Sequence, residues 1–133
     1  MKVTKRDGTR EDLNIDKLHK VVMYAVEGLT GVSASQVEIN SQIPFYDGIA
    51  STDIQETLIK STADLITEET PNYQYVAGRL INYHLRKMVY DTFEPPCLCD
   101  IVQKNIDDGF YDPEFVELYT KEEINQLQTY INH

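Results

Sequence analysis

The sequence predicts a mainly α-helical fold with a small β-hairpin near its start and a short helical appendage after it. Three observations support this prediction. An Asp-Gly pair separates two short extended stretches, four segments with apolar residues at helical spacing follow, and Pro95-Pro96 then interrupts the chain. The length of 133 residues and the 41% share of hydrophobic residues fit one domain, or one small domain with an appendage.

The first element is a β-hairpin over residues 3–13. Asp7-Gly8 favours a tight turn in which both central residues adopt positive φ, and extended stretches flank this pair. Val3 and Leu13 are the expected inward-facing anchors. Because two strands alone are only marginally stable in water, we expect this hairpin to pack against the helices that follow.

The first helix is expected over residues 16–29. Its apolar residues recur every three or four positions, which is typical of a helix with one buried face. Asn14 precedes it as a candidate N-cap. Gly28 and Gly31 mark its end.

The next two helices are expected over residues 34–45 and 52–68. The first of them has a weak apolar pattern and would begin after Ser33. The second has a clear apolar stripe, and Thr52 and Gln55 have the spacing of a capping box. The strength of these patterns predicts that the second of the two contributes more to the core.

A fourth helix is expected over residues 73–90, after a proline. His84 falls on its apolar face, so we interpret it as a packed histidine, whereas His19 reads as an exposed helix residue. Lys87 lies close to the C-terminal end of this helix. Four tyrosines at near-helical spacing are interpreted as core and interface residues: Tyr73, Tyr75, Tyr83 and Tyr90.

A domain boundary is expected near Pro95-Pro96, with one domain over residues 1–92 and the appendage over residues 93–133. Three short helices are expected in the appendage, over residues 97–107, 113–118 and 120–131. Thr120 and Glu123 again have the spacing of a capping box.

Composition excludes several classes of protein. No apolar run approaches the roughly 18 residues of a membrane span, and the start of the chain lacks a signal peptide, so we expect a cytoplasmic protein without membrane contact. The net charge of −10 argues against binding to nucleic acid duplexes. Cys97 and Cys99 form neither a C-x-x-C pair nor half of a zinc site, and we expect no metal site built by the protein.

Charge is distributed unevenly along the chain. Residues 1–20 contain six of the twelve Lys and Arg residues against four acids, a local charge of +2. The remaining residues contain six bases against eighteen acids, a charge of −12. A basic end on an acidic body is compatible with a local anion site, and equally with an ordinary solvated surface.

Several groups could converge on one phosphorylated ligand. Lys5 and Arg6 lie beside the hairpin turn, Lys17 lies in the first turn of the first helix, Ser51 precedes the third, and Lys87 lies late in the fourth. A triphosphate needs several cations and backbone donors together. The chain contains neither a Walker A sequence nor G-x-G-x-x-G, so a nucleotide would be bound without those loops.

Residues near the hairpin could also recognise a base and a ribose. Glu11 and Asn14 are polar, and Asn offers both a donor and an acceptor, as the adenine edge requires. Apolar residues that could enclose the ring are Val3, Leu13, Ile15 and Leu18. Each of these features has an ordinary structural interpretation as well, because Asn14 could act only as a helix cap and Lys5-Arg6 only as a solvated turn.

The order of these strings resembles a known family. They are Val3-Thr4-Lys5-Arg6-Asp7-Gly8, Asn14-Ile15-Asp16-Lys17-Leu18, Ala25-Val26-Glu27-Gly28-Leu29, Phe45-Tyr46-Asp47-Gly48-Ile49, Pro71-Asn72-Tyr73-Gln74-Tyr75, Leu85-Arg86-Lys87, Phe93-Glu94-Pro95-Pro96 and Tyr111-Asp112. Together they resemble the ATP-cone and the segment after it in the large subunit of class Ia ribonucleoside-diphosphate reductase, as found in enterobacteria and their large phages. The resemblance covers essentially the whole chain.

The resemblance implies a short β-hairpin or sheet that caps a four-helix bundle, with residues 93–133 as the start of the helical part of the large subunit. It implies an overall-activity site for ATP or dATP, with Mg²⁺, in an enzyme that makes deoxyribonucleotides for DNA synthesis. The implied partners are the rest of the large subunit and the radical-bearing small subunit. No catalytic residue of the family matches this chain.

Residue by residue, the resemblance implies phosphate contacts from Lys5, Arg6, Ser51 and Lys87. It implies base and ribose contacts from Glu11, Asn14 and Lys17, with a pocket wall from Val3, Ile15 and Leu18. Two positions depart from the family. Ser51 replaces the usual Thr and keeps the hydroxyl, and Gln55 replaces the usual His at a position that helps to distinguish dATP from ATP, as in some phage reductases.

Two other functions fit parts of the pattern. The chain could be a subunit-docking module of the reductase in which nucleotide binding is vestigial. ATP-cones also occur in a family of transcription repressors, but those carry a zinc ribbon of four cysteines before the cone, and this chain has only two cysteines.

Overall fold

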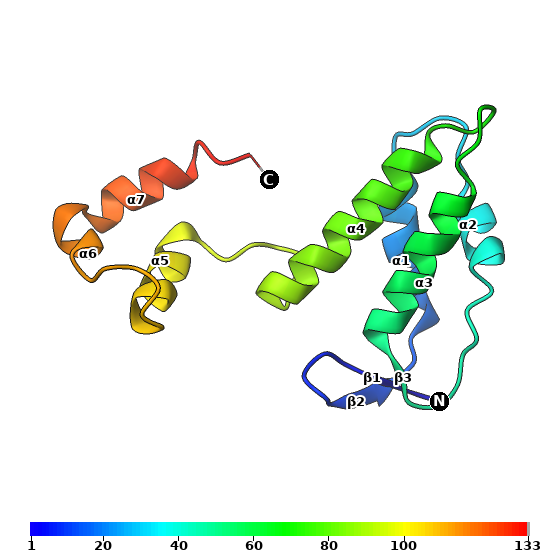
Figure 1. Ribbon diagram of the computed structural model, residues 1–133, viewed down its shortest axis with the longest axis horizontal. Coiled ribbons are helices and arrows are strands. Elements are labelled where there is room, and N and C mark those ends of the chain that lie inside the picture. Colours follow the sequence, from blue (N-terminus) through cyan, green and yellow to red (C-terminus); the bar gives the residue numbers. More distant parts are fainter. Residues whose placement is uncertain (133) are drawn as a thin grey trace. The chain divides into compact units, whose positions relative to one another are not determined.

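The computed structural model describes residues 1–132, which divide into two compact units between Asp91 and Thr92. The first unit contains β1 (Lys2–Thr4), β2 (Arg10–Asp12), α1 (Ile15–Val26), α2 (Ala34–Ser41), β3 (Ile49–Ala50), α3 (Ser51–Asp64) and α4 (Tyr73–Tyr90). The second contains α5 (Leu98–Asp107), α6 (Phe115–Leu118) and α7 (Lys121–Gln128). The prediction of a mainly helical fold with a small hairpin is confirmed (Figure 1).

The sheet contains the predicted hairpin and one further strand, in the order β2-β1-β3. β1 pairs antiparallel with β2 and parallel with β3, so that Val3 stands opposite both Glu11 and Ile49. The two-residue β3 was not predicted, because so short a strand shows no alternation in sequence. Val3, Ile49 and Ile54 form a small buried cluster where the sheet meets α3.

The turn of the hairpin differs from the prediction. Only Gly8 has positive φ, at +83°, whereas Asp7 does not. The Gly8 N–H donates to the Lys5 carbonyl, and the Asp7 carboxylate accepts from both the N–H and the hydroxyl of Thr9. The loop is therefore longer than a two-residue turn, and Asp7 closes it with its side chain.

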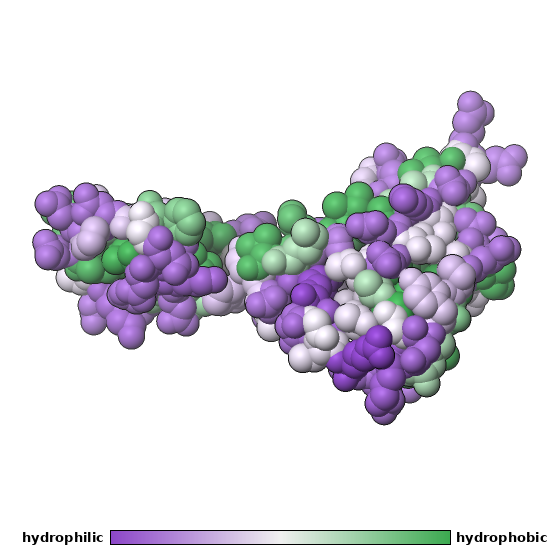
Figure 2. Space-filling model, turned by 60° about the horizontal axis from the view of Figure 1, so that its bottom comes forward, coloured by the Kyte–Doolittle hydropathy of each residue, from purple (hydrophilic) through white to green (hydrophobic). Residues whose placement is uncertain are grey.

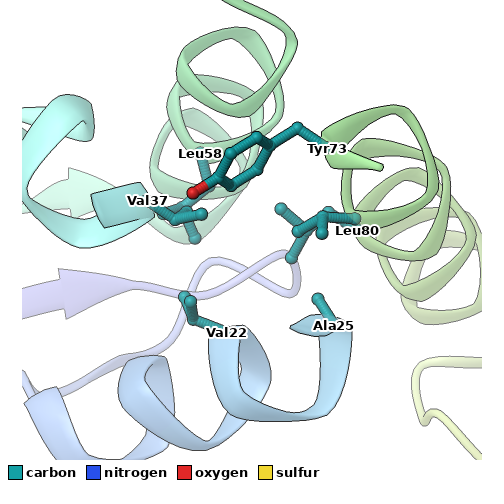
Figure 3. Close-up of a cluster of buried hydrophobic side chains, with 7 residues drawn as sticks. Val22, Ala25, Val37, Leu58, Tyr73 and Leu80 are labelled. Carbon is teal, nitrogen blue, oxygen red and sulfur yellow. The ribbon is translucent and has the colours of Figure 1, made fainter. Parts of the chain in front are cut away.

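The four long helices of the first unit share one core. Its seven buried residues come from all four helices: Val22, Ala25, Val37, Leu58, Tyr73, Val76 and Leu80 (Figure 3). Burying a side chain of this size stabilises the fold by about 1.5–3 kcal/mol. Figure 1 shows the sheet across the end of this bundle where α3 begins.

Three helices of the first unit end earlier than predicted, and the first of them is α1, which ends at Val26 rather than at residue 29. α2 ends at Ser41 because Gln42 adopts the left-handed conformation, with φ +40°, so Phe45 lies in a loop. α3 ends at Asp64 rather than at residue 68. Only Val37 of the apolar residues predicted for α2 lies in the main core, and Ile39 is 69% exposed, which explains its weak pattern.

Helix caps were predicted with mixed success. Asn14 caps α1 by accepting from the Lys17 N–H at 3.2 Å, and Ser33 caps α2. The capping box of Thr120 and Glu123 is present at α7. The capping box predicted at Thr52 is wrong, because α3 begins one residue earlier, after Ala50, and no side chain caps it.

α4 has the predicted bounds, but only its first half is buried in the core. Val76 and Leu80 are fully buried, whereas Ile81, Leu85 and Met88 are about half exposed. The side chains in the second half of α4 are therefore available for contacts outside the core.

The second unit has a small core of its own. Val102 and Ile124 are buried, and α5 packs against α7. Many large apolar side chains remain exposed, including Phe110 at 78% and Leu118 at 70%, and Figure 2 shows apolar surface among the polar residues of this unit. No helix among residues 1–132 is long and apolar enough to cross a membrane.

Candidate functional site

One cleft lies where the hairpin, the start of α1, the start of α3 and the second half of α4 meet. Its lining residues are Val3, Lys5, Arg6, Glu11, Asp12, Leu13, Asn14, Lys17, Leu18, Val21, Ser51, Ile54, Gln55, Tyr83 and Lys87. Figure 2 turns this end of the first unit toward the reader and shows a largely hydrophilic surface. The fold thus brings together nearly all residues singled out from the sequence, although they span more than 80 positions.

Ile15 is the exception among those residues. It is the first residue of α1 and is 62% exposed. It lines a separate groove with His19, Glu38 and Phe45 instead. Its expected place in the pocket wall is therefore not supported, because the start of α1 turns this side chain toward α2.

Cationic side chains reach the cleft from three elements. Lys5 and Arg6 follow β1, Lys17 lies in the first turn of α1, and Lys87 lies in the last turn of α4. Glu11 pairs with two of them, since its carboxylate oxygens lie 3.3 Å from Lys17 Nζ and 3.5 Å from Lys5 Nζ. The hydrogen bond from Lys17, reinforced by both positive charges, lowers the pKa of Glu11 below its ordinary value.

The start of α3 adds backbone donors to the same cleft. The chain passes from β3 directly into α3, so Ser51 occupies the first helical position. No side chain caps this end, so the first N–H groups of α3 have no acceptor from a capping residue. These N–H groups and the positive end of the helix dipole lie at the cleft, which Ser51 lines. Such a helix start favours a bound anion.

Gln55 places a buried acceptor in this cleft. It lies in the second turn of α3, and its Oε1 is buried without a hydrogen-bond partner among the described residues. An unsatisfied buried acceptor costs about 1–3 kcal/mol.

The apolar part of the wall comes from β1, α1 and α3. It comprises Val3, Leu13, Leu18, Val21 and Ile54. Val21 and Ile54 were missed as site residues, since helical periodicity assigns them only to a buried face. Tyr83 was missed as well, although its spacing of four from Lys87 places both on one side of α4, with Lys87 Nζ 5.7 Å from the Tyr83 ring centroid.

A sequence model of the ATP cone domain matches residues 1–88, about two thirds of the chain. The chain belongs to the ATP-cone family. Its matched part coincides closely with the first compact unit, and the fold agrees with the bundle and capping sheet implied by the resemblance. ATP-cones are regulatory domains whose effectors are ATP and dATP.

Ribonucleoside-diphosphate reductase α subunits are similar to this ATP-cone chain over 131 residues. Identity is 54% with subunit 1 α of Escherichia coli, 50% with the α subunit of Haemophilus influenzae and 37% with that of Enterobacteria phage T4. Each match covers 98% of this chain but only 17% of the relative. The chain therefore spans a small part of the length of these relatives.

The structure of this ATP-cone corrects the interpretation of His84 as a packed residue. This residue is not packed in the core but is half-buried, and its Nδ1 lies 3.1 Å from Arg6 Nη2. Burial lowers the pKa of His84, the positive charge of Arg6 lowers it further, and Glu56 partly opposes both. His84 thus contacts Arg6, which lines the cleft.

Proposed function

We propose that this ATP-cone binds ATP or dATP in the cleft and reports the nucleotide level to a ribonucleoside-diphosphate reductase, the enzyme that makes deoxyribonucleotides for DNA synthesis. The observation that carries the proposal is the meeting of Lys5, Ser51 and Lys87, from three separate segments, around one cleft. The residues of this chain have no catalytic role in the proposal. They bind the effector only.

The triphosphate would lie against the cationic side of the cleft. Lys5, Arg6 and Lys87 would contact phosphate oxygens, and Ser51 would contribute its hydroxyl and the backbone donors at the start of α3. Charge-assisted contacts of this kind are stronger than neutral ones and suit a highly charged group. Mg²⁺ would accompany the nucleotide, because it binds readily to phosphate oxygens.

The nucleoside would lie toward the hairpin. Glu11, Asn14 and Lys17 would contact the base and ribose, with Val3 and Leu18 against the ring. The Asn14 Oδ1 already accepts from the Lys17 N–H, so this side chain would offer its amide N–H groups to the ligand. Gln55 also lines the cleft, at the position where the family usually has His, which suits a role in distinguishing dATP from ATP.

A thermal-shift titration tests this proposal. A ligand that binds only the folded chain stabilises it by about 2.7 kcal/mol at a hundredfold excess over Kd. We expect ATP and dATP to raise the melting temperature at millimolar concentration, and CTP to do so much less. An unchanged melting temperature with ATP and dATP would overturn the proposal.

A docking role is the second candidate, and it would leave nucleotide binding vestigial. The observation in its favour is the apolar surface of the second unit, where Phe110 and Leu118 are largely exposed. We propose that residues 93–133 form the start of the helical part of a large subunit and pack there on the rest of that subunit, and that the chain also contacts the radical-bearing small subunit. A chain that binds no nucleotide but forms a complex with those polypeptides would favour docking alone.

A further inference from the structure

Arg6 and His84 join the hairpin to α4 across 78 positions of sequence. Arg6 Nη2 lies 3.1 Å from His84 Nδ1. Arg6 lines the cleft, whereas His84 does not. The contact thus lies beside the cleft, at the guanidinium group of a residue that lines it.

The chemistry of this contact fixes the protonation of the imidazole. A guanidinium group has five donors and no acceptor, so His84 Nδ1 must accept and the ring proton must lie on Nε2. The charged groups that face this ring are Arg6 from the hairpin and Glu56 from α3. Burial and Arg6 together outweigh Glu56, which keeps the ring neutral near pH 7 and able to accept.

The contact also limits the motion of Arg6. An arginine beside a turn samples many rotamers when nothing holds it, and a bound ligand must then order it. A hydrogen bond to a half-buried ring on a long helix removes much of that freedom before the ligand arrives. Groups that are positioned in advance bind more tightly because less ordering remains.

We propose that His84 is a positioning residue of the nucleotide site, which holds the Arg6 guanidinium where it meets the phosphates of the effector. This inference rests on the proposed function and adds a residue to it. His84 need not touch the nucleotide, because its effect passes through Arg6. The ligand class is the polyphosphate part of the effector, and the nucleoside part is not involved.

The experiment is a double-mutant cycle on the full chain, with ATP affinity measured by calorimetry. The variants are His84→Ala, His84→Asn, Arg6→Ala and the double variant Arg6→Ala with His84→Ala. We expect His84→Ala to weaken ATP binding about fivefold, the size of one ordinary hydrogen bond. His84→Asn should restore most of the affinity, since the Asn Oδ1 can accept where Nδ1 does.

The decisive result is the dependence on Arg6. In the Arg6→Ala background, His84→Ala should have no further effect on ATP affinity. His19→Ala is the matched control, because the ring of His19 contacts Glu38 in a different groove. This variant should leave ATP affinity unchanged. Adenosine should bind all His84 variants equally.

Two outcomes would overturn the inference. One is an equal loss of ATP affinity from His84→Ala in the original chain and in the Arg6→Ala background, which would show that His84 does not act through Arg6. The other is unchanged ATP affinity in His84→Ala, which would show that the contact does not contribute to binding. Absence of ATP binding by the unmodified chain would remove the proposed function and this inference together. Binding without coupling between Arg6 and His84 would remove only the inference.

Discussion

Lys17 Nζ lies 3.3 Å from one carboxylate oxygen of Glu11. The other oxygen of Glu11 lies 3.5 Å from Lys5 Nζ, so a single internal anion is shared by two cations of the cleft. These groups are partly exposed, so the pairs contribute little to stability. Their importance lies in competition, because a polyphosphate must attract Lys5 away from Glu11.

Glu11→Gln should therefore change ligand preference. Removal of the carboxylate charge frees Lys5 for phosphates, so inorganic tripolyphosphate should bind several-fold more tightly. ATP should gain less, because Glu11 is also proposed to contact its nucleoside. Calorimetry with both ligands checks this, with Glu38→Gln in another groove as control. A weaker affinity for tripolyphosphate would contradict competition by Glu11.

Lys5→Ala and Lys87→Ala should each weaken ATP binding more than tenfold while the fold stays intact. A desolvated charge-assisted contact is worth about 1.5–3 kcal/mol, which corresponds to that loss. Circular dichroism monitors the fold, and calorimetry measures the affinity. Lys60→Ala, at an exposed position on α3 that does not line the cleft, is the control. Undiminished ATP affinity in both cleft variants would refute the phosphate assignment.

Gln55→His should increase the preference for dATP over ATP. The residue reaches the cleft from α3, and the family usually has His at this position. The ratio of the two dissociation constants, measured on the same preparation, is the readout. If the ratio stays the same, Gln55 does not take part in this discrimination.

Gln55→Met should stabilise the ligand-free chain. The substitution keeps the length of the side chain and removes the buried acceptor that lacks a partner. Relief of about 1 kcal/mol would raise the melting temperature by roughly 4–8 °C in a domain of this size. ATP affinity should fall in the same variant. A lower melting temperature without ligand would show that Oε1 is already satisfied, for example by water.

Stability should fall between pH 7.5 and pH 5.5, in part because of His84. The pKa of this residue is lowered in the folded chain, chiefly by burial, so the unfolded chain binds more protons as the pH falls below about 6.5. The free energy of unfolding therefore decreases in this window. His84→Asn should show a smaller decrease. Melting curves at three pH values check this, and an identical pH dependence in both chains would contradict the lowered pKa.

The sequence predicts the helices of this ATP-cone well where local signals are strong. Asn14 at the start of α1 and Thr120 at the start of α7 are side-chain caps that the pattern identifies correctly. The end of α2 was missed because it depends on the left-handed Gln42, a residue type with no strong preference for that conformation. β3 is a strand through its pairing with β1, and a local sequence pattern does not show that pairing.

The cleft was predictable mainly through the resemblance to a family. Spacing alone could not place Lys5 near Lys87, since the distance between them depends on how the hairpin folds across the bundle. Tyr83 and His84 lie beyond the part of α4 that the core buries, so periodicity assigned them a role that the tertiary structure changes. Ile15 lines the groove with Phe45 instead of the cleft, and its position as the first residue of α1 could not reveal this from sequence spacing.

The most direct test of the central claim is a titration of the isotope-labelled chain with ATP, followed by NMR. If one cleft holds the nucleotide, the backbone amides of Lys5, Ser51 and Lys87 should shift together with one common dissociation constant. The amides of α7 should not move. Shifts confined to one of these three segments, or centred on another part of the chain, would contradict the claim.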